Sequence, residues 1–565
     1  MNTVQTILAS AALLTTSGVY ADSHSGTLPV LYVNTENNQE ITSKEDYLTA
    51  SYYLESNGNP DIESIGGPDD LQTVEIKGRG NYTWIGFDKK PYKLKFPKKI
   101  EFMGMDKNKH FALLAHADDN QGFMRNITGF ELSRRLGLAW TPSDKPIEFY
   151  LNGDYKGLYF ATQTIRIDKT RVNITEQEDE ATVNVDGGWL VEIDNYDTDP
   201  HVTVTEHNGY PIYFTYKSPE ILSNEQLIYL SEQVNSMNDA IYNSDKNSDE
   251  WLQYIDLESA ARFYIVQEIM DDCESYHGSC YIYKDSGEGE KWHFGPVWDF
   301  GNAFQRGDKE KFIWKDPTFN QTWIGEIYKY PVFQEKVKEV WADFCKNGYD
   351  GLEQYIKDYA DKIAEAAHYN FARWNQYGND DVVRKANDMI NSIRKSVDWL
   401  GDRWGMKPSI SPDDPIDIFL RGDFNNWSTS DKFRCIGDNI YEIDLTDIDL
   451  YRNGATYFKI ASEDWTTVDY GAPEGAGPLN LENTYKLEKQ GANVILPAGI
   501  TNHKMIFNLK DETLLITNGS GVNGILSETD TDTEIYTITG QRVSEMKESG
   551  IYILKTPTRT VKIIK

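Results

Sequence analysis

Two aspartates on either side of a predicted β-hairpin are the residues of this sequence best suited to chemistry. Asp272, with Asp271 beside it, ends an apolar run that has the length of a buried helix. The stretches 280–283 and 292–298 alternate like two strands, and a Gly-rich turn joins them. Asp299 follows the second strand and begins an Asp-Phe-Gly tripeptide. Because a hairpin brings its two ends together, we expect the two acids to meet.

Two neighbouring acids of this kind suit phosphoryl transfer. The reaction needs Mg²⁺ held against the phosphates of ATP and a carboxylate beside the attacking hydroxyl. On this hypothesis Asp299 is the metal ligand, Asp272 is the catalytic acid, and Asp271 is the alternative to Asp272. Asp-Phe-Gly is also common in turns, so a plain turn is the competing interpretation. The chain lacks H-R-D, V-A-I-K and G-x-x-x-x-G-K-[ST] motifs, which argues against an ordinary protein kinase or P-loop enzyme.

A basic segment offers cations for nucleotide phosphates. Lys90, Lys93 and Lys95 lie in the run K-K-P-Y-K-L-K-F, and Arg79 lies in the preceding R-G-N-Y-T-W. Strand alternation puts Lys93 and Lys95 on one face and the apolar residues around them on the other. In so acidic a chain the cluster predicts nucleotide binding, and a solvated basic strand face is the alternative.

A later strand carries two further acids. The stretch G-G-W-L-V-E-I-D places Glu192 and Asp194 on one face, because residues two apart in a strand point the same way. Paired carboxylates there would bind the ribose of a nucleotide or a cation, and an exposed sheet face is the other interpretation. A glycoside hydrolase that pairs Glu192 or Asp194 with Asp272 is a further hypothesis, which requires carboxyls about 5–10 Å apart.

The pattern of the elements predicts a mixed α+β fold. Strands are expected at 28–33 and 74–80, with a short helix at 43–48. Asn152-Gly153 predicts a two-residue hairpin turn. Helical periodicity covers 120–138, 224–243, 251–270, 336–345, 352–371 and 381–404.

Composition limits the class of protein. The chain has 565 residues and a formal net charge of -33, which predicts several domains and a surface that repels nucleic acid and anionic membranes. Residues 1–21 have the apolar centre and small-residue end of a signal peptide, although they lack Lys and Arg. No other run is long enough for a transmembrane segment. We therefore expect an exported protein, secreted or at the outer cell surface, that passes through the periplasm.

The cysteines leave one pairing open. The chain has 4 Cys, too few for a disulfide scaffold. Cys273 and Cys280 flank the predicted catalytic loop and would form a disulfide in an oxidising compartment. Two buried thiols are the alternative.

A Pro- and Asp-rich linker predicted at 408–415 precedes a region of different character. Residues 416–518 consist of short predicted strands and turns, which favours an immunoglobulin-like β-sandwich. Trp427 and Trp465 in this region either stack on sugar rings or belong to the core. The pattern of residues 519–565 predicts a short tail of β-strands, which is too small to be stable alone.

Several segments, in order, make the sequence resemble the CotH-type atypical kinases first recognised in bacterial spore coats. The resemblance covers roughly 28–405 and defines a domain at 22–407. It rests on R-G-N-Y-T-W with K-K-P-Y-K-L-K-F, H-F-A-L-L-A-H-A-D-D-N-Q-G-F-M-R-N, Y-L-N-G-D-Y-K-G-L-Y-F, G-G-W-L-V-E-I-D and F-G-P-V-W-D-F-G. It implies a diverged protein-kinase-like fold of two lobes with Mg-ATP bound between them.

By position, the resemblance also implies roles for single residues. Asp299 would hold the metal, Asp272 would meet the substrate hydroxyl, and the basic segment would face the phosphates. From its position on the predicted helix alone, Glu131 is the candidate partner of a lysine. Many members have a second Asp where this chain has Gly301, and others have Asn in the catalytic loop where this chain has Ser279. These departures leave the second metal ligand unassigned.

Two shorter resemblances concern the rest of the chain. The segment 421–427 is similar to starch-binding and pullulanase-associated sandwich domains, and the tail is similar to C-terminal sorting domains of type IX secretion. We expect an exported atypical kinase that transfers phosphate from Mg-ATP to hydroxyls of a protein substrate at the cell surface or secreted. The alternative is a non-catalytic, glycan-binding or adhesion protein on a kinase-like scaffold.

Overall fold

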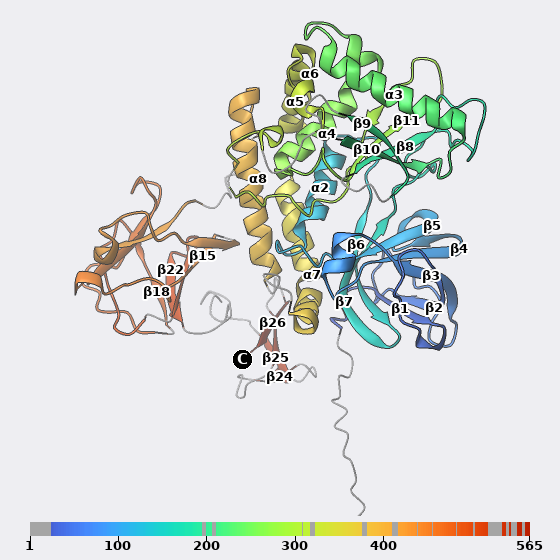
Figure 1. Ribbon diagram of the computed structural model, residues 1–565. Coiled ribbons are helices and arrows are strands. Elements are labelled where there is room, and N and C mark those ends of the chain that lie inside the picture. Colours follow the sequence, from blue (N-terminus) through green and yellow to red (C-terminus); the bar gives the residue numbers. More distant parts are fainter. Residues whose placement is uncertain are drawn as a thin grey trace, which may run out of the picture. The chain divides into compact units, whose positions relative to one another are not determined.

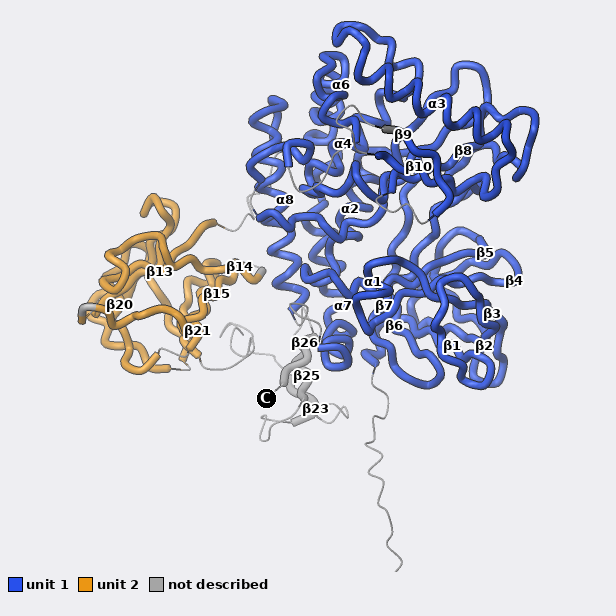
Figure 2. Tube along the Cα trace, in the orientation of Figure 1, with its two compact units in different colours: residues 1–409 blue, residues 410–565 orange. Residues whose placement is uncertain are grey.

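The computed structural model of the chain divides it into two compact units, Met1–Ser409 and Ile410–Lys565 (Figure 2). The predicted signal peptide lies outside the described residues, as does the predicted linker apart from Pro408. The described residues are 24–194, 199–205, 211–307, 309–316, 322–375, 381–408, 416–437, 439–454, 456–481, 483–500, 503–517 and the backbone of four tail strands.

Seven strands of the first unit close into a barrel in the order β1-β2-β3-β4-β5-β7-β6 (Figure 1). Neighbouring strands are antiparallel except at the closure, where β1 and β6 run parallel. The closure pairs these strands without a free sheet edge. The strands are β1 (Val30–Thr35), β2 (Leu48–Glu55), β3 (Gln72–Gly78), β4 (Tyr92–Phe102), β5 (Met105–Leu114), β6 (Asp144–Leu151) and β7 (Asp154–Gln163).

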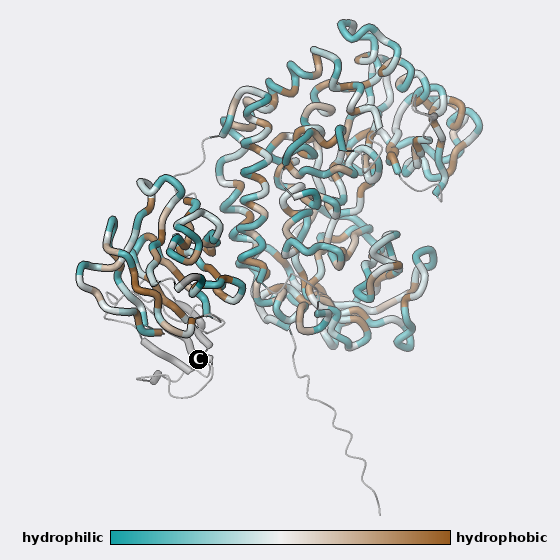
Figure 3. The backbone as a smooth tube through the Cα atoms, turned by 60° about the vertical axis from the view of Figure 1, so that its left-hand side comes forward, coloured by the Kyte–Doolittle hydropathy of each residue, from teal (hydrophilic) through white to brown (hydrophobic). Residues whose placement is uncertain are grey.

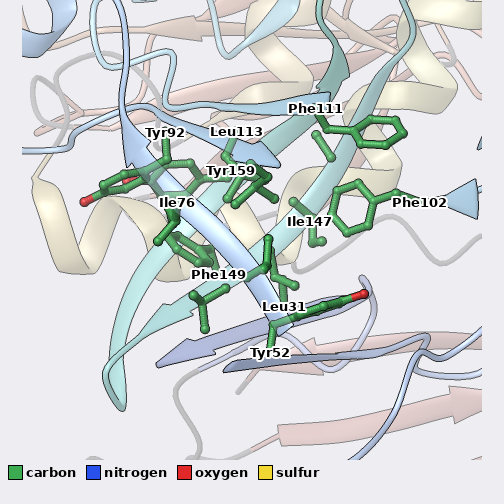
Figure 4. Close-up of a cluster of buried hydrophobic side chains, with 14 of the residues drawn as sticks. Leu31, Tyr52, Ile76, Tyr92, Phe102, Phe111, Leu113, Ile147, Phe149 and Tyr159 are labelled. Carbon is green, nitrogen blue, oxygen red and sulfur yellow. The ribbon is translucent and has the colours of Figure 1, made fainter. Parts of the chain in front are cut away.

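Alternating burial along the strands fills the barrel with side chains. In β4, Tyr92, Leu94 and Phe96 are buried, whereas Lys93 and Lys95 are half-buried on the other face, as the alternation predicted. Each large apolar side chain buried in this way contributes about 1.5–3 kcal/mol. The interior is therefore packed core. Figure 4 labels Leu31, Tyr52, Ile76, Tyr92, Phe102, Phe111, Leu113, Ile147, Phe149 and Tyr159.

The hairpin between β6 and β7 forms at the predicted turn. Asn152 and Gly153 have φ values of 53° and 76°, the left-handed region that a type I′ turn requires at both central positions. Asn and Gly tolerate this region better than other residues. The local signal therefore sets the register of these two strands.

A second sheet of the first unit has the order β12-β11-β8-β10-β9. Its strands are β8 (Trp189–Asp194), β9 (His201–Thr205), β10 (Pro211–Ser218), β11 (Cys280–Lys284) and β12 (His293–Phe294). The predicted hairpin is present, because β11 and β12 pair with Ile282 opposite Phe294. The second strand is shorter than predicted, since β12 ends at Phe294.

The first unit also contains α-helices (Figure 1). Helix α2 packs against α4 and α7, and α7 packs along α8. They are α1 (Tyr82–Gly86), α2 (Met124–Arg135), α3 (Asn224–Asn243), α4 (Leu257–Met270), α5 (Ile324–Ile327), α6 (Pro331–Asp343), α7 (Leu352–Trp374) and α8 (Val382–Trp404). Apolar residues recur at helical spacing, so buried positions of α8 include Ala386, Met389, Ile390, Ile393, Val397 and Leu400. Figure 3 shows hydrophobic and hydrophilic positions interleaved along the chain.

The second unit contains two sheets around one apolar core. One sheet has the order β13-β16-β17-β19, with β20 paired to β16, and the other has the order β14-β15-β21-β22-β18. Their strands are β13 (Phe419–Gly422), β14 (Arg434–Gly437), β15 (Ile440–Asp444), β16 (Tyr457–Ala461), β17 (Asp469–Gly471), β18 (Thr484–Lys486), β19 (Glu488–Lys489), β20 (Val494–Ile495), β21 (Lys504–Asn508) and β22 (Thr513–Thr517). The tail adds a sheet of β23 (Glu534–Thr537), β24 (Arg542–Val543), β25 (Ile551–Lys555) and β26 (Thr560–Ile564).

The α+β class is confirmed, but several local predictions are wrong and the barrel closure was not predicted. No helix forms at 43–48, because the Ser43 hydroxyl accepts the backbone N–H groups of Glu45 and Asp46, each at 3.0 Å, and makes a local turn. Helix α4 begins at Leu257 rather than at 251. Across the described parts of the chain, no helix combines the length and apolar character that crossing a membrane requires.

Candidate active site

A cleft of about 1270 Å³ in the first unit brings together residues that are far apart in the sequence. Its walls come from β3, the start of β4, the loop before α2, the sheet strands β8 and β10, and the segment after α4. The residues used below are Arg79, Lys93, Asp118, Glu192, Asp194, Lys217, Glu274, Asp299 and Asn302.

Asp299 is exposed in this cleft, and helix α2 fixes the loop that carries it. The next residue, Phe300, is fully buried, and its backbone N–H donates to Asn126 Oδ1 at 2.9 Å. The Phe300 ring lies directly on Gly129, where a Cβ would be 2.2 Å from a ring carbon. Asp299 has a φ of 56°, a left-handed conformation that these anchors hold in place.

Asp118, from the loop between β5 and α2, also lines the cleft. Burial, followed by the negative charge of Asp299, raises the pKa of Asp118 to about 6. This residue was not singled out from the sequence as part of the site. The available signals were the acid pair Asp118-Asp119 itself, of a kind common in loops, and its place in the H-F-A-L-L-A-H-A-D-D-N-Q-G-F-M-R-N motif.

The structure does not bring the predicted catalytic acids into the cleft. Asp271 ends α4 with a φ of 50°, and Asp271 and Asp272 are each 1% exposed and absent from the cleft walls. Glu274 lines the cleft instead and accepts a hydrogen bond from the Asn302 side-chain amide. Asp272 Oδ1 accepts the backbone N–H of Glu274 at 3.3 Å, so Asp272 supports the turn that presents Glu274. Burial above all, then the charges of Glu274 and Asp299, raise the pKa of Asp272 well above its ordinary value.

Asp271 belongs to a buried ion cluster formed by Glu268, Asp271, Arg306, Lys309 and Asp316. Arg306 pairs with Asp271 and, at 2.8 Å, with Asp316. Lys309 pairs with Glu268 and, at 3.2 Å, with Asp271. The Asp271 and Lys309 side chains are each 1% exposed. The carboxylate of Asp271 therefore compensates buried positive charge.

The predicted cations divide into two groups. Arg79 and Lys93 line the cleft. Lys90 donates to a backbone carbonyl oxygen at 2.7 Å, and Lys95 pairs with Glu75 at 2.9 Å, and neither lines the cleft. Burial first, then neighbouring cations, lower the pKa of Lys93 to about 8.

Glu192 and Asp194 line the cleft together. Lys217, which the sequence pattern did not single out, lies beside them and pairs with Glu192 at 2.9 Å and with Asp199 at 3.4 Å. Burial raises the pKa of Glu192, and the charge of Lys217 opposes that shift. Lys217 is therefore a cation of the cleft that is already paired with acids.

A second cavity of about 690 Å³ adjoins the cleft, and we call it the side cavity. Arg79, Lys93 and Lys217 line both spaces. The side cavity extends to residues 164–167, which follow β7. A ligand with an anionic part and a second, less polar part therefore has room in both spaces, with its anionic part beside the three shared cations and its other part in the side cavity.

Glu131 was expected to pair with a lysine, but it pairs with two arginines instead. Its carboxylate pairs with Arg134 at 3.0 Å and with Arg135 at 2.8 Å, on the same helix. The spacing of three and four residues along α2 makes these local pairs favourable.

The cysteines are all free. Cys273 and Cys280 are buried thiols, which was the second interpretation of the pair. Burial above all raises the pKa of Cys273 to about 12 and also raises that of Cys280. Ser279, just before Cys280, lines the cleft.

In the second unit, Trp427 and Trp465 lie together, half-buried, with ring centroids 6.1 Å apart. The buried Arg421 guanidinium lies 4.0 Å from the Trp465 ring centroid and donates to the Trp427 carbonyl oxygen at 2.7 Å. The same arginine thus contacts the Trp465 ring and the backbone of Trp427.

Comparison with known proteins places the first unit in a family. No curated protein matches the chain. A family model described as "CotH: CotH kinase protein" matches residues 75–402. This span includes the cleft acids and cations described above, and it covers more than half of the 565 residues. The chain therefore belongs to the CotH kinase family.

Proposed function

We propose that this protein is an exported atypical kinase that transfers phosphate from Mg-ATP to hydroxyls of a surface or secreted protein. The observation that carries the proposal is one cleft that is lined by the acids Asp118, Glu274 and Asp299 and by the cations Arg79 and Lys93. Family membership supports the kinase class, and residues 1–21 support export by their signal-like sequence.

The nucleotide would use the cleft and the side cavity together. Its triphosphate carries the charge that Arg79, Lys93 and Lys217 complement, and these residues line both spaces. Its base would occupy the side cavity near 164–167. We propose that the barrel with α2 acts as one lobe and the remaining helices and second sheet as the other.

The donor atoms of the cleft fit Mg²⁺. Asp299 supplies a carboxylate, the hard oxygen ligand that Mg²⁺ prefers. Mg²⁺ in kinase sites uses one or two carboxylates and completes its shell with water and phosphates. Among the described residues, no three His, Cys, Asp or Glu side chains form a metal-binding group. When bound, Mg²⁺ supplies positive charge that offsets the charge on the transferring phosphate.

Glu274 is the proposed general base. Its carboxylate takes the proton of the acceptor hydroxyl, whose oxygen forms a new bond to the γ-phosphorus. The bond from that phosphorus to the bridging oxygen breaks, and ADP leaves with that oxygen. Asn302 donates to Glu274 and holds its carboxylate in the cleft. Arg79 and Lys93 hold the phosphates against this base.

A nucleotide-dependent thermal shift tests the proposal. We expect ATP with Mg²⁺ to raise the melting temperature of the full-length protein, because a ligand at about 100 times its Kd stabilises by roughly 2.7 kcal/mol. In the Asp299→Asn variant the part of the shift that requires Mg²⁺ should disappear. ATP labelled at the γ-phosphate should label the protein itself or a co-expressed surface protein.

A null result would favour the alternative, a glycan-binding or adhesion protein without catalysis. The half-buried pair Trp427 and Trp465 motivates that alternative, since paired aromatic rings can stack on sugars. The proposal fails if nucleotide leaves the melting temperature unchanged and no label is transferred. An oligosaccharide shift that is lost in Trp465→Ala would then establish the alternative.

A pH dependence of nucleotide affinity is expected from Lys93. Its pKa is lowered from 10.5 to about 8 by burial, then by Lys77, Arg166 and Arg79, and Glu220 opposes the shift. Lys93 is therefore charged below pH 8 and loses its proton as the pH rises above 8. Nucleotide affinity should fall above pH 8, by at most about tenfold per pH unit for one proton.

Titration of ATP binding from pH 6.5 to pH 9.5 by calorimetry checks this expectation. The Lys93→Arg variant is the matched control, because arginine keeps its charge over the whole range. A wild-type profile that is flat, or as steep in the arginine variant, would show that Lys93 does not face the phosphates.

A further inference from the structure

Two carboxylates from different parts of the fold, those of Asp299 and Asp118, border the space beside Gly301. A Cβ at Gly301 would lie 3.1 Å from Asp299 Oδ1 and 3.2 Å from Asp118 Oδ2. Gly301 has an ordinary φ, so no backbone requirement explains the glycine. The absent side chain leaves a cradle between the two acids.

The loop that carries Asp118 is built to stay in this position. Asp119 Oδ1 accepts the backbone N–H of Gln121 at 2.7 Å. Arg125 is 3% exposed, and its Nη1 donates to the Gly301 carbonyl oxygen at 2.7 Å. Asp119 Oδ2 accepts the backbone N–H of Arg125 at 3.4 Å. One arginine thus ties the Asp118 loop to the loop of Gly301.

The two acids need a positive charge between them. Asp299 Oδ1 and Asp118 Oδ2 lie 3.1 Å and 3.2 Å from the same Cβ position at Gly301, and like charges close together repel. Among the ion pairs of the described residues, none includes Asp118 or Asp299. Arg79 feels the charge of Asp299 but lies beyond ion-pair distance. A divalent cation in the cradle would compensate both carboxylates at once.

We propose that Asp118 supplies the second protein carboxylate to the divalent cation, in place of the side chain absent at Gly301. The inference rests on the proposed function for the identity of the cation. It assigns a ligand from the loop before α2, whereas the resemblance placed this ligand directly after Asp299 and Phe300.

Manganese binding to the full-length protein tests the assignment without an activity assay. The probe is Mn²⁺, with and without ADP, followed by the electron paramagnetic resonance signal of the free ion. We expect Asp118→Asn to raise the Kd for Mn²⁺ by about tenfold or more, because even residues one shell beyond a metal change its affinity 10- to 100-fold. Asp88→Asn removes an exposed acid of the same cleft and should leave the Kd within about twofold, since exposed charges are screened.

A rescue variant separates ligation from a general effect of charge. Asp118→Ala alone should lose Mn²⁺ binding, and Asp118→Ala with Gly301→Asp should regain most of it. The alanine also clears the 3.2 Å approach that would otherwise crowd the new side chain. Melting temperatures recorded without metal show whether each variant is folded, and only folded variants are compared.

The outcomes distinguish this inference from the proposed function. Mn²⁺ binding that weakens equally in Asp118→Asn and Asp88→Asn, or that the double variant does not regain, overturns the role of Asp118 alone. Mn²⁺ binding that depends on Asp118 but is unchanged by ADP supports the ligand and counts against the kinase. A wild-type protein that binds no Mn²⁺ under either condition overturns both.

Discussion

Glu274→Gln is expected to slow phosphoryl transfer by about 10²- to 10⁴-fold, the usual contribution of a general base. Glutamine keeps the size of the side chain and can still accept from the Asn302 amide, but it cannot take a proton. Nucleotide affinity should stay unchanged, because the binding cations are untouched. Single-turnover transfer from labelled ATP measures the rate, and calorimetry measures the affinity.

Asp272→Asn is the matched control for this prediction. Asp272 is 1% exposed and supports the Glu274 turn through a 3.3 Å hydrogen bond, which the asparagine oxygen can also accept. The rate should therefore fall much less than in Glu274→Gln. A rate that collapses in Asp272→Asn and persists in Glu274→Gln would return the role of base to Asp272.

Asp271→Ala is expected to lower the free energy of unfolding of the first unit by about 3 kcal/mol, since removing one partner of a buried ion pair leaves charge uncompensated. Arg306 and Lys309 both pair with this carboxylate. Urea unfolding followed by circular dichroism measures the loss, with the transition of the first unit analysed by itself. Folded Asp271→Ala protein should keep its affinity for nucleotide.

An exposed ion pair provides the comparison for this stability prediction. Glu339 pairs with Lys336 on α6, and the Glu339 side chain is 70% exposed. Glu339→Ala should change unfolding little, because exposed pairs gain little and are screened by salt. An equal effect of the two substitutions, or a loss of nucleotide binding in folded Asp271→Ala, would contradict a structural role for Asp271.

Local patterns in the sequence predicted most of the elements. The alternation at Lys93 and Lys95 matches β4, and Asn152-Gly153 forms the turn before β7. The helical run at 224–243 is α3 itself. These predictions depend only on residues that are close together in the sequence. The period of their apolar residues is the period at which side chains are buried in the folded strand or helix. The acidic strand at Glu192 and Asp194 was predictable for the same reason.

The composition of the cleft was less predictable, because each acid in Asp-Asp-Cys-Glu depends on distant partners. Asp271 turns away into an ion cluster with Arg306 and Lys309, more than 30 residues later, and Glu274 is left to face Asn302. The sequence shows three acids close together, but it does not show which of their carboxylates are buried away from solvent in the folded protein. That choice follows from burial, which only the packed chain defines.

The periodicity and the order of motifs in the amino-acid sequence were enough to predict the family and the α+β class. They also gave the hypothesis that the Asp-Phe-Gly segment binds the metal. Closure of the barrel through the parallel pair β1 and β6, and the meeting of Asp118 with Asp299 across Gly301, arise only in the folded molecule. Hydrogen bonds between distant strands and contacts between loops have no periodic signature, since they join residues more than 100 positions apart. The chemistry proposed for this protein depends on those long-range contacts.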